Sequence, residues 1–151
     1  WHWWSGMAKL HVSMVAHHLV VAAAFYLGLS YRFGTYYMTC LLVNEGTTPF
    51  LHLRWMLAQG KYREHTVARL NEYIFAALFL LLRVIATSLI ALHLTVCMLL
   101  YIPSHGARDP PVLLMIPLPL LAYVHLGLNL YWFSLIAKAY RARSSSNEKA
   151  A

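Results

Sequence analysis

The sequence predicts an all-α protein, a bundle of helices that spans a membrane several times. Of its 151 residues, 60% are apolar and only 11% are charged, whereas soluble proteins contain roughly 45–50% and 25%. A soluble domain of this size buries only about 70% of the surface of its unfolded chain, so lipid is the expected solvent for the remaining apolar surface. Apolar segments of spanning length recur four times along the chain.

Three of these segments are nearly uninterrupted. Residues 12–30 and 73–101 are apolar over the roughly 20 residues that a helix needs to cross the hydrocarbon core. Residues 112–137 also qualify, and Pro117 and Pro119 lie near their start, where a proline ends or kinks a helical turn. We therefore expect three regular spans from these segments.

The remaining segment, residues 33–57, is interrupted in its middle. The run Asn44-Glu45-Gly46-Thr47-Thr48-Pro49 combines a carboxylate with a glycine and a proline, so we expect a broken or kinked span here. The four spans together define one membrane domain at 12–137. We expect an interfacial segment before the first helix at 1–11 and a basic, disordered cytosolic tail at 138–151.

The distribution of basic residues supports four crossings, because cytoplasmic loops carry an excess of lysine and arginine. With a crossing at each proposed span, nine basic residues fall on one side and two on the other: Lys9, Arg54, Lys61, Arg63, Arg69, Lys138, Arg141, Arg143 and Lys149 against Arg32 and Arg108. Both ends of the chain are therefore predicted to be cytosolic. The same asymmetry accounts for the formal net charge of +7, so no nucleic-acid partner is expected.

The cysteines indicate neither a disulfide framework nor a metal site. Cys40 and Cys97 lie far apart, each inside an apolar run, and neither has the spacing to other ligands that is typical of zinc sites. We therefore predict no bound metal.

Polar side chains accumulate at similar depth in the predicted spans. A charged residue at the centre of a membrane helix costs about 2.5–3.5 kcal/mol, so each one needs a partner or a function. At about 1.5 Å per residue, polar groups from all four spans fall in the cytosolic half of the bilayer, where we expect them to face one cavity. The candidate catalytic residues are His17, His18, Glu45 and His52, and the candidate lipid-binding residues are Thr48, Arg83, His125 and Asn129.

Helical spacing groups several of these residues. Glu45, Thr48 and His52 follow the i, i+3, i+7 pattern of one helix face, and His125 and Asn129 are one helical turn apart. An alternative stays open in which these residues only stabilise the helix bundle. Glu45 would then form a buried ion pair with Arg83, and the histidines and the asparagine would form hydrogen bonds between helices, each contributing about 0.6–2 kcal/mol to stability.

The order of these features resembles the TLC-domain family of endomembrane proteins. The resemblance rests on the pair His17-His18 in an apolar helix, on the broken helix around Glu45, and on the later helix with Arg83. Residues 45–55 read E-G-T-T-P-F-L-H-L-R-W and fit the pattern E-x-(S/T)-(S/T)-P-F-x-x-x-R-W of small TLC-domain-containing proteins. Such proteins have further spans before the double-histidine helix, so the resemblance over 12–137 implies an N-terminally incomplete domain.

The ceramide synthases of this family join an acyl chain from acyl-CoA to a sphingoid amine. Their Lag motif, H-D-x-x-D-x-x-x-E, falls here on Asn44, Glu45, Thr48 and His52, and only the second position keeps an acidic residue. This departure weakens the expectation of acyl transfer, which needs a base beside the attacking amine.

The resemblance therefore implies a protein of lipid homeostasis in the endoplasmic reticulum or another endomembrane, which binds a lipid or an acyl chain in the polar cavity. Sphingolipid N-acyl transfer with acyl-CoA as co-substrate is one alternative, and neither of these functions requires a resident cofactor. The other alternative is a haem-binding or structural subunit of a membrane complex, with His17 or His18 opposite His52 or His125. Membrane lipids are the expected partners, and a homo-oligomer or a partner in a membrane complex stays open.

Overall fold

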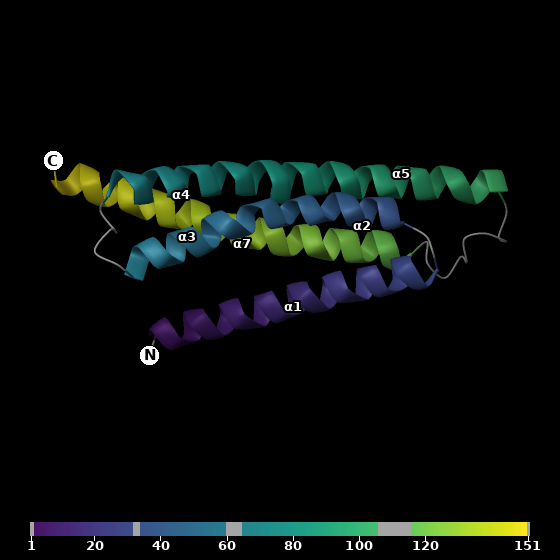
Figure 1. Ribbon diagram of the computed structural model, residues 1–151, viewed down its shortest axis with the longest axis horizontal. Coiled ribbons are helices and arrows are strands. Elements are labelled where there is room, and N and C mark those ends of the chain that lie inside the picture. Colours follow the sequence, from purple (N-terminus) through teal and green to yellow (C-terminus); the bar gives the residue numbers. More distant parts are fainter. Residues whose placement is uncertain (1, 32–33, 60–64, 106–115, 151) are drawn as a thin grey trace. The chain divides into compact units, whose positions relative to one another are not determined.

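The computed structural model describes residues 2–31, 34–59, 65–105 and 116–150, which are helical almost throughout and contain no strand (Figure 1). The prediction of an all-α fold is confirmed. The helical segments are α1 (His2–Ser30), α2 (Thr35–Leu41), the 3₁₀ segment η1 (Leu42–Thr47), α3 (Thr48–Gln59), α4 (Thr66–Leu78), the π segment η2 (Phe79–Ala86), α5 (Thr87–His105) and α7 (Pro117–Ala150). The chain divides into a first unit, residues 1–41 with 88–128, and a second unit, residues 42–87 with 129–151.

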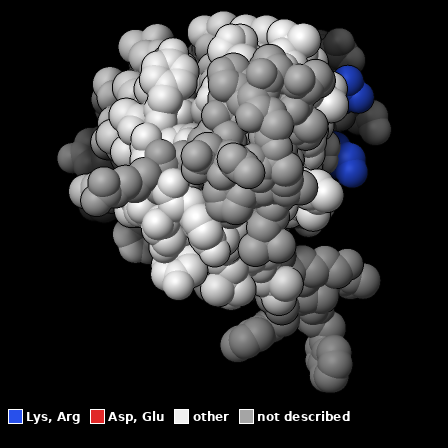
Figure 2. All heavy atoms as spheres, turned by 90° about the vertical axis from the view of Figure 1, so that its right-hand side faces the viewer, with Lys and Arg blue, Asp and Glu red and all other residues white. Residues whose placement is uncertain are grey.

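Three helical stretches of the described residues are long and apolar enough to cross a membrane, namely Val12–Ser30, Thr66–Leu100 and Pro117–Ala142. Large apolar side chains are exposed on all three, among them Val12, Leu19, Leu29, Leu89, Leu92, Leu99, Leu120 and Val124. Figure 2 looks onto one end of the long axis, where the described side chains are almost all uncharged. The exposed apolar side chains along the three stretches suit contact with lipid tails.

The segment predicted as a broken span is divided into α2, η1 and α3, none of which reaches spanning length alone. The 3₁₀ segment coincides with Asn44 to Thr47, and α3 begins one residue before Pro49. A helix tolerates a proline in its first turn, because the backbone N–H that proline lacks would have no hydrogen-bond partner within the helix there. The predicted break is confirmed, and the crossing of the membrane by this segment stays a prediction.

Two terminal segments differ from the prediction. Helix α1 begins at His2, so residues 2–11 belong to the first helix and do not precede it. Helix α7 continues to Ala150, so residues 138–150, predicted to be disordered, are helical. Alanine, lysine and arginine favour helices, and extending an existing helix avoids the cost of nucleation.

Two span boundaries also shift. The long helix begins at Thr66, before the predicted start at residue 73. Helix α7 begins at Pro117, a favoured residue type for a helix start, and residues 112–115 of the predicted span lie outside the described residues.

The first unit has an apolar core to which four helices contribute. Its fully buried members come from α2, α5 and α7, and partly buried residues of α1 pack against them: Met38, Ala91, Leu94, Met98, Leu118 and Ala122, with Ala24, Phe25 and Leu27. The spacing of three and four residues on α5 and α7 places these side chains on one face of each helix.

The second unit is organised around one face of α4 and η2. The buried residues on this face recur every three or four positions: Ala68, Asn71, Phe75, Phe79 and Arg83. Asn71 Nδ2 donates a hydrogen bond of 3.0 Å to the carbonyl oxygen of Phe50, which joins α4 to α3. The Phe79 ring lies 5.8 Å from the Phe75 ring and 6.4 Å from the Phe133 ring, so it connects this face to α7. Figure 1 shows α3 beside the start of α4.

Gly34, just before α2, has a φ of 73°, which a residue with a side chain adopts only at a cost. We expect Gly34→Ala to lower the free energy of unfolding by about 1–2 kcal/mol. Gly127→Ala is the matched control, because a Cβ there meets nothing within 4 Å and alanine favours the helix. Thermal unfolding in detergent checks both variants, and equal melting temperatures would contradict the strain at Gly34.

Candidate functional site

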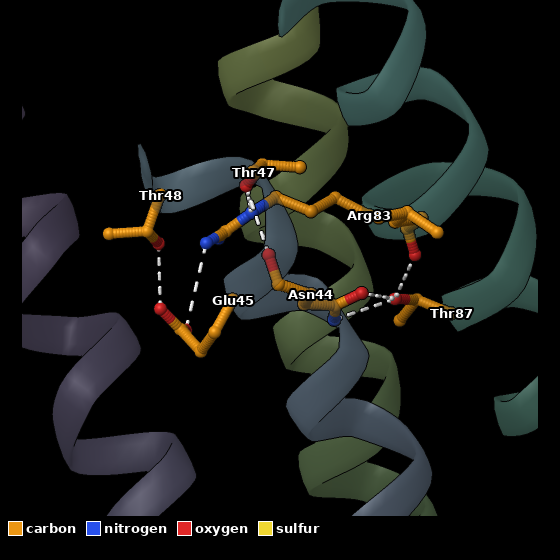
Figure 3. A network of polar contacts seen from close by, with 7 residues as sticks. Asn44, Glu45, Thr47, Thr48, Arg83 and Thr87 are labelled. Atoms are coloured by element: carbon orange, nitrogen blue, oxygen red, sulfur yellow. Dashed lines mark hydrogen bonds and ion pairs between the residues drawn. The ribbon is translucent and has the colours of Figure 1, made fainter. Parts of the chain in front are cut away.

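A polar network joins η1 to η2 in the second unit (Figure 3). Arg83 reaches from η2, and its Nε donates a hydrogen bond of 2.7 Å to Thr47 Oγ1. Thr47 Oγ1 in turn donates a bond of 2.9 Å to the carbonyl oxygen of Asn44. The threonine hydroxyl is therefore fixed by one donor and one acceptor, and it orients the guanidinium group.

The guanidinium group also forms an ion pair with Glu45. Arg83 Nη2 lies 3.7 Å from Glu45 Oε1, while Thr48 Oγ1 donates a hydrogen bond of 2.7 Å to Glu45 Oε2. The two side chains differ in burial, since 9% of Arg83 and 58% of Glu45 is exposed. The arginine end of the ion pair is therefore buried, and the carboxylate end is accessible.

Asn44 and Thr87 form a second branch of the network. Asn44 Nδ2 donates a hydrogen bond of 3.0 Å to Thr87 Oγ1. The Thr87 hydroxyl lies 3.4 Å from Asn44 Oδ1 and 3.3 Å from the Leu82 carbonyl oxygen, to one of which it donates. Both side chains are buried, and this branch holds η1 against the end of η2.

The backbone around Arg83 is a π-helix from Phe79 to Ala86. An α-helix repeats every 3.6 residues, so side chains four positions apart drift around it, whereas the wider π-helix has more residues per turn. This geometry helps to keep Phe79, Arg83 and Thr87 on the buried side. The guanidinium carbon of Arg83 lies 5.6 Å from the centre of the Phe79 ring. π-Helical segments of this kind are frequent at functional sites.

The Asn44–Thr87 branch gives a direct test of the network's stability. We expect Thr87→Val to lower the free energy of unfolding by about 1–3 kcal/mol, because the buried amide of Asn44 loses its hydroxyl partner. Thr87→Ser keeps the hydroxyl and serves as the control. Unfolding of the two variants in detergent checks the expectation, and a valine variant as stable as the serine variant would contradict it.

Asn129 lies on α7, one helical turn before Phe133. Two ring contacts join α7 to the long helix, since Tyr73 lies 6.0 Å from Tyr140 and Phe79 lies 6.4 Å from Phe133. Residue numbers fall on α7 as they rise on α4 and η2, so Asn129 lies beyond the Phe79–Phe133 contact in the direction of Arg83. Asn129 has no exposed surface, and its Nδ2 and Oδ1 have no hydrogen-bond partner among the described residues.

Three of the predicted histidines belong to the first unit. His17 and His125 are buried, and their rings are 4.9 Å apart with 32° between the planes. His18 is exposed, and its ring lies 5.4 Å from that of His17. Because the rings of His17 and His125 touch each other, haem iron between them would require the rings to separate.

Of the predicted site residues, the second unit therefore brings together Glu45, Thr48 and Arg83. Asn129 belongs to the same unit. His52 is exposed on α3, and it makes no hydrogen bond or ring contact within the described part of the chain. Sequence reasoning did not select Asn44 and Thr47 as site residues, although both lie in the polar run, and it missed Thr87. The position of Thr87, one turn after Arg83, was the available signal.

Long apolar helices and a charged network between helical segments define the class of protein as a helical integral membrane protein. The chain belongs to the TLC domain family, whose family model matches residues 1–138. It is similar to TLC domain-containing protein 4 A of Dictyostelium discoideum, with 32% identity over 72 residues. That match covers 46% of this chain and 28% of the relative. No solved structure matches the chain.

Proposed function

We propose that the protein acts in membrane lipid homeostasis by binding the polar end of a lipid or an acyl chain at the Glu45–Arg83 network. The observation that carries the proposal is the amide of Asn129 in the same unit, which is fully buried and has no hydrogen-bond partner among the described residues. Buried polar groups are nearly always bonded, and an orphaned one needs an explanation. A bound polar group provides it.

The network offers complementary groups to such a ligand. Glu45 presents an exposed carboxylate that accepts hydrogen bonds, and Arg83 has donors in a rigid fork. The Asn129 amide can both donate and accept. A lipid phosphate, carboxylate, hydroxyl or amide group matches this set, whereas an unmodified hydrocarbon chain does not.

The proposal does not extend to catalysis. Of the network residues, only Glu45 has a side chain of the kind that serves as a general base, so a base in this network would have to be this carboxylate. Acyl transfer with acyl-CoA rests on the family resemblance alone. The same holds for the endoplasmic reticulum as the location and for sphingolipids as the lipid class.

Asn129→Leu tests the proposal because it separates binding from folding. Leucine has a similar shape, and removing an unbonded buried amide leaves the unfolding free energy unchanged or raises it. We expect this variant of the whole protein to reach the membrane in normal amounts. We also expect it to leave the lipid profile of gene-deleted cells uncorrected.

Wild type and Thr95→Val are the controls for this rescue. Thr95 lies 3.2 Å from the Tyr123 hydroxyl in the first unit, so its loss removes a polar contact outside the network. Both controls should restore the profile. Full restoration by Asn129→Leu would overturn the proposal.

A further inference from the structure

A second polar site lies in the second unit, where a cavity of about 200 Å³ opens between α3, α4 and α7. Its lining combines an acidic and a basic side chain with aromatic and aliphatic walls: Arg54, Glu72, Phe75, Ile136, Ala139 and Tyr140. None of these residues belongs to the Glu45–Arg83 network. The cavity therefore needs an interpretation of its own.

The basic side chain in the cavity, Arg54, is held only by a long ion pair. Arg54 Nε lies 3.6 Å from Glu72 Oε1, and 46% of the arginine side chain is exposed. Apart from this ion pair, Arg54 makes no hydrogen bond or ion pair with another described residue. Exposed pairs of this length contribute little to stability, so a ligand can replace the contact at small cost.

Two aromatic rings also line the cavity. Phe75 and Tyr140 line it together with Glu72, and the Tyr73 ring lies 6.0 Å from the Tyr140 ring. A carboxylate beside aromatic faces is the arrangement that binds ammonium groups, while a guanidinium fork binds phosphate. The cavity thus presents both halves of a zwitterion binding site.

The depth of the cavity fits a lipid head group. Glu72 lies six residues after the start of the candidate span Thr66–Leu100, and Tyr140 lies two residues before the end of Pro117–Ala142. At about 1.5 Å per residue the two stretches are about 52 Å and about 39 Å long, which exceeds the ~30 Å hydrocarbon core, so residues near their ends fall in the interfacial zone. Cavities for whole drug-sized ligands measure roughly 300–1,000 Å³, so this one suits a head group whose chains stay in the bilayer.

We propose that this cavity binds the head group of a zwitterionic phospholipid, with the phosphate on Arg54 and the ammonium group on Glu72 and the Tyr140 ring. A lipid with phosphate but no ammonium group would leave its negative charge beside Glu72. The site therefore favours phosphatidylethanolamine and phosphatidylcholine over phosphatidylglycerol. This proposal is independent of the function proposed for Glu45 and Arg83.

Native mass spectrometry of the whole protein, titrated separately with phosphatidylcholine, phosphatidylethanolamine and phosphatidylglycerol, tests the site. We expect wild type to bind the two zwitterionic lipids about tenfold more tightly, the value of one charged contact of about 1.4 kcal/mol. Glu72→Gln should abolish this preference, and Arg54→Gln should weaken binding of all three lipids. Arg54→Lys, which keeps the charge, should retain much of the phosphate binding.

Lys138→Gln is the matched control, since it removes an exposed positive charge on α7 that does not line the cavity. It should leave the lipid preference intact. Melting temperatures show whether each variant is folded. Equal binding of phosphatidylglycerol by wild type, or an unchanged preference in a folded Glu72→Gln variant, would overturn the proposal.

Discussion

Replacing Arg83 by methionine is expected to lower the free energy of unfolding by about 1.5–3 kcal/mol, because the buried Thr47 hydroxyl loses its charged donor. The exposed carboxylate of Glu45 also loses its countercharge. Methionine keeps much of the length and apolar volume of the arginine side chain, so the loss is chiefly electrostatic. Unfolding in detergent and the yield of membrane-inserted protein measure the effect.

A second substitution should reverse part of this loss. In Arg83→Met/Glu45→Gln, neither partner is charged, and the glutamine oxygen still accepts the hydrogen bond from Thr48 Oγ1. Replacing both members of an ion pair removes both charges together, so neither charge is left without its partner. We expect the double variant to be more stable than Arg83→Met. A double variant as unstable as Arg83→Met would show that the ion pair does not contribute to the loss.

Phe79→Ala is the second substitution for which we expect a large loss in the free energy of unfolding. The Phe79 ring is 5% exposed and contacts the rings of Phe75 and Phe133, and it lies under the Arg83 guanidinium group. Truncating a buried phenylalanine costs about 3–5 kcal/mol in soluble proteins. Lipid tails replace water in a membrane, so we expect a value near the lower end of this range.

Phe79→Leu is the control for this truncation, since it retains most of the apolar volume and should cost less than about 1.5 kcal/mol. Chemical unfolding of both variants in the same detergent gives the comparison. Equal stabilities would show that the ring contacts between α4, η2 and α7 contribute little.

The long helices were predictable because a continuous apolar run of about 20 residues admits few structures other than a membrane helix. The interruption around Asn44 to Pro49 was predictable for the same local reasons, since it concentrates residues that weaken helices. The ion pair between Glu45 and Arg83, expected as the structural alternative, is present. The long helices and the interruption depend only on the residues of one segment. The ion pair was predictable because each charged residue within a span needs an oppositely charged partner.

Other features depend on geometry that spacing does not show. The position of Thr87 one turn after Arg83 suggested that both face the same side, but spacing does not show that Thr87 bonds to Asn44 of another segment. The tail after residue 138 is polar but rich in helix-forming residues, and composition alone favoured disorder over the observed helix. The prediction that all the polar groups face one cavity stays a prediction. The structure describes a charged network in the second unit and a histidine pair in the first.

The predicted topology depends on the broken segment. Three stretches of the described residues have spanning length, and an odd number of crossings places the two ends on opposite sides. Both ends are cytosolic, as the basic residues predict, only if α2, η1 and α3 together cross the membrane as a fourth span. A crossing there would also place Glu45 and Arg83 within the bilayer, where an ion pair without a use is costly.

The most direct test of the lipid-binding account is rescue by the charge-neutral double variant. Gene-deleted cells would receive wild type or Arg83→Met/Glu45→Gln of the whole protein at equal membrane abundance, and their full lipid profiles would be measured. We expect the double variant to be folded and inserted but to leave the shifted lipid class uncorrected. Restoration equal to wild type would contradict the account, since it would mean that the Glu45–Arg83 network only holds η1 and η2 together.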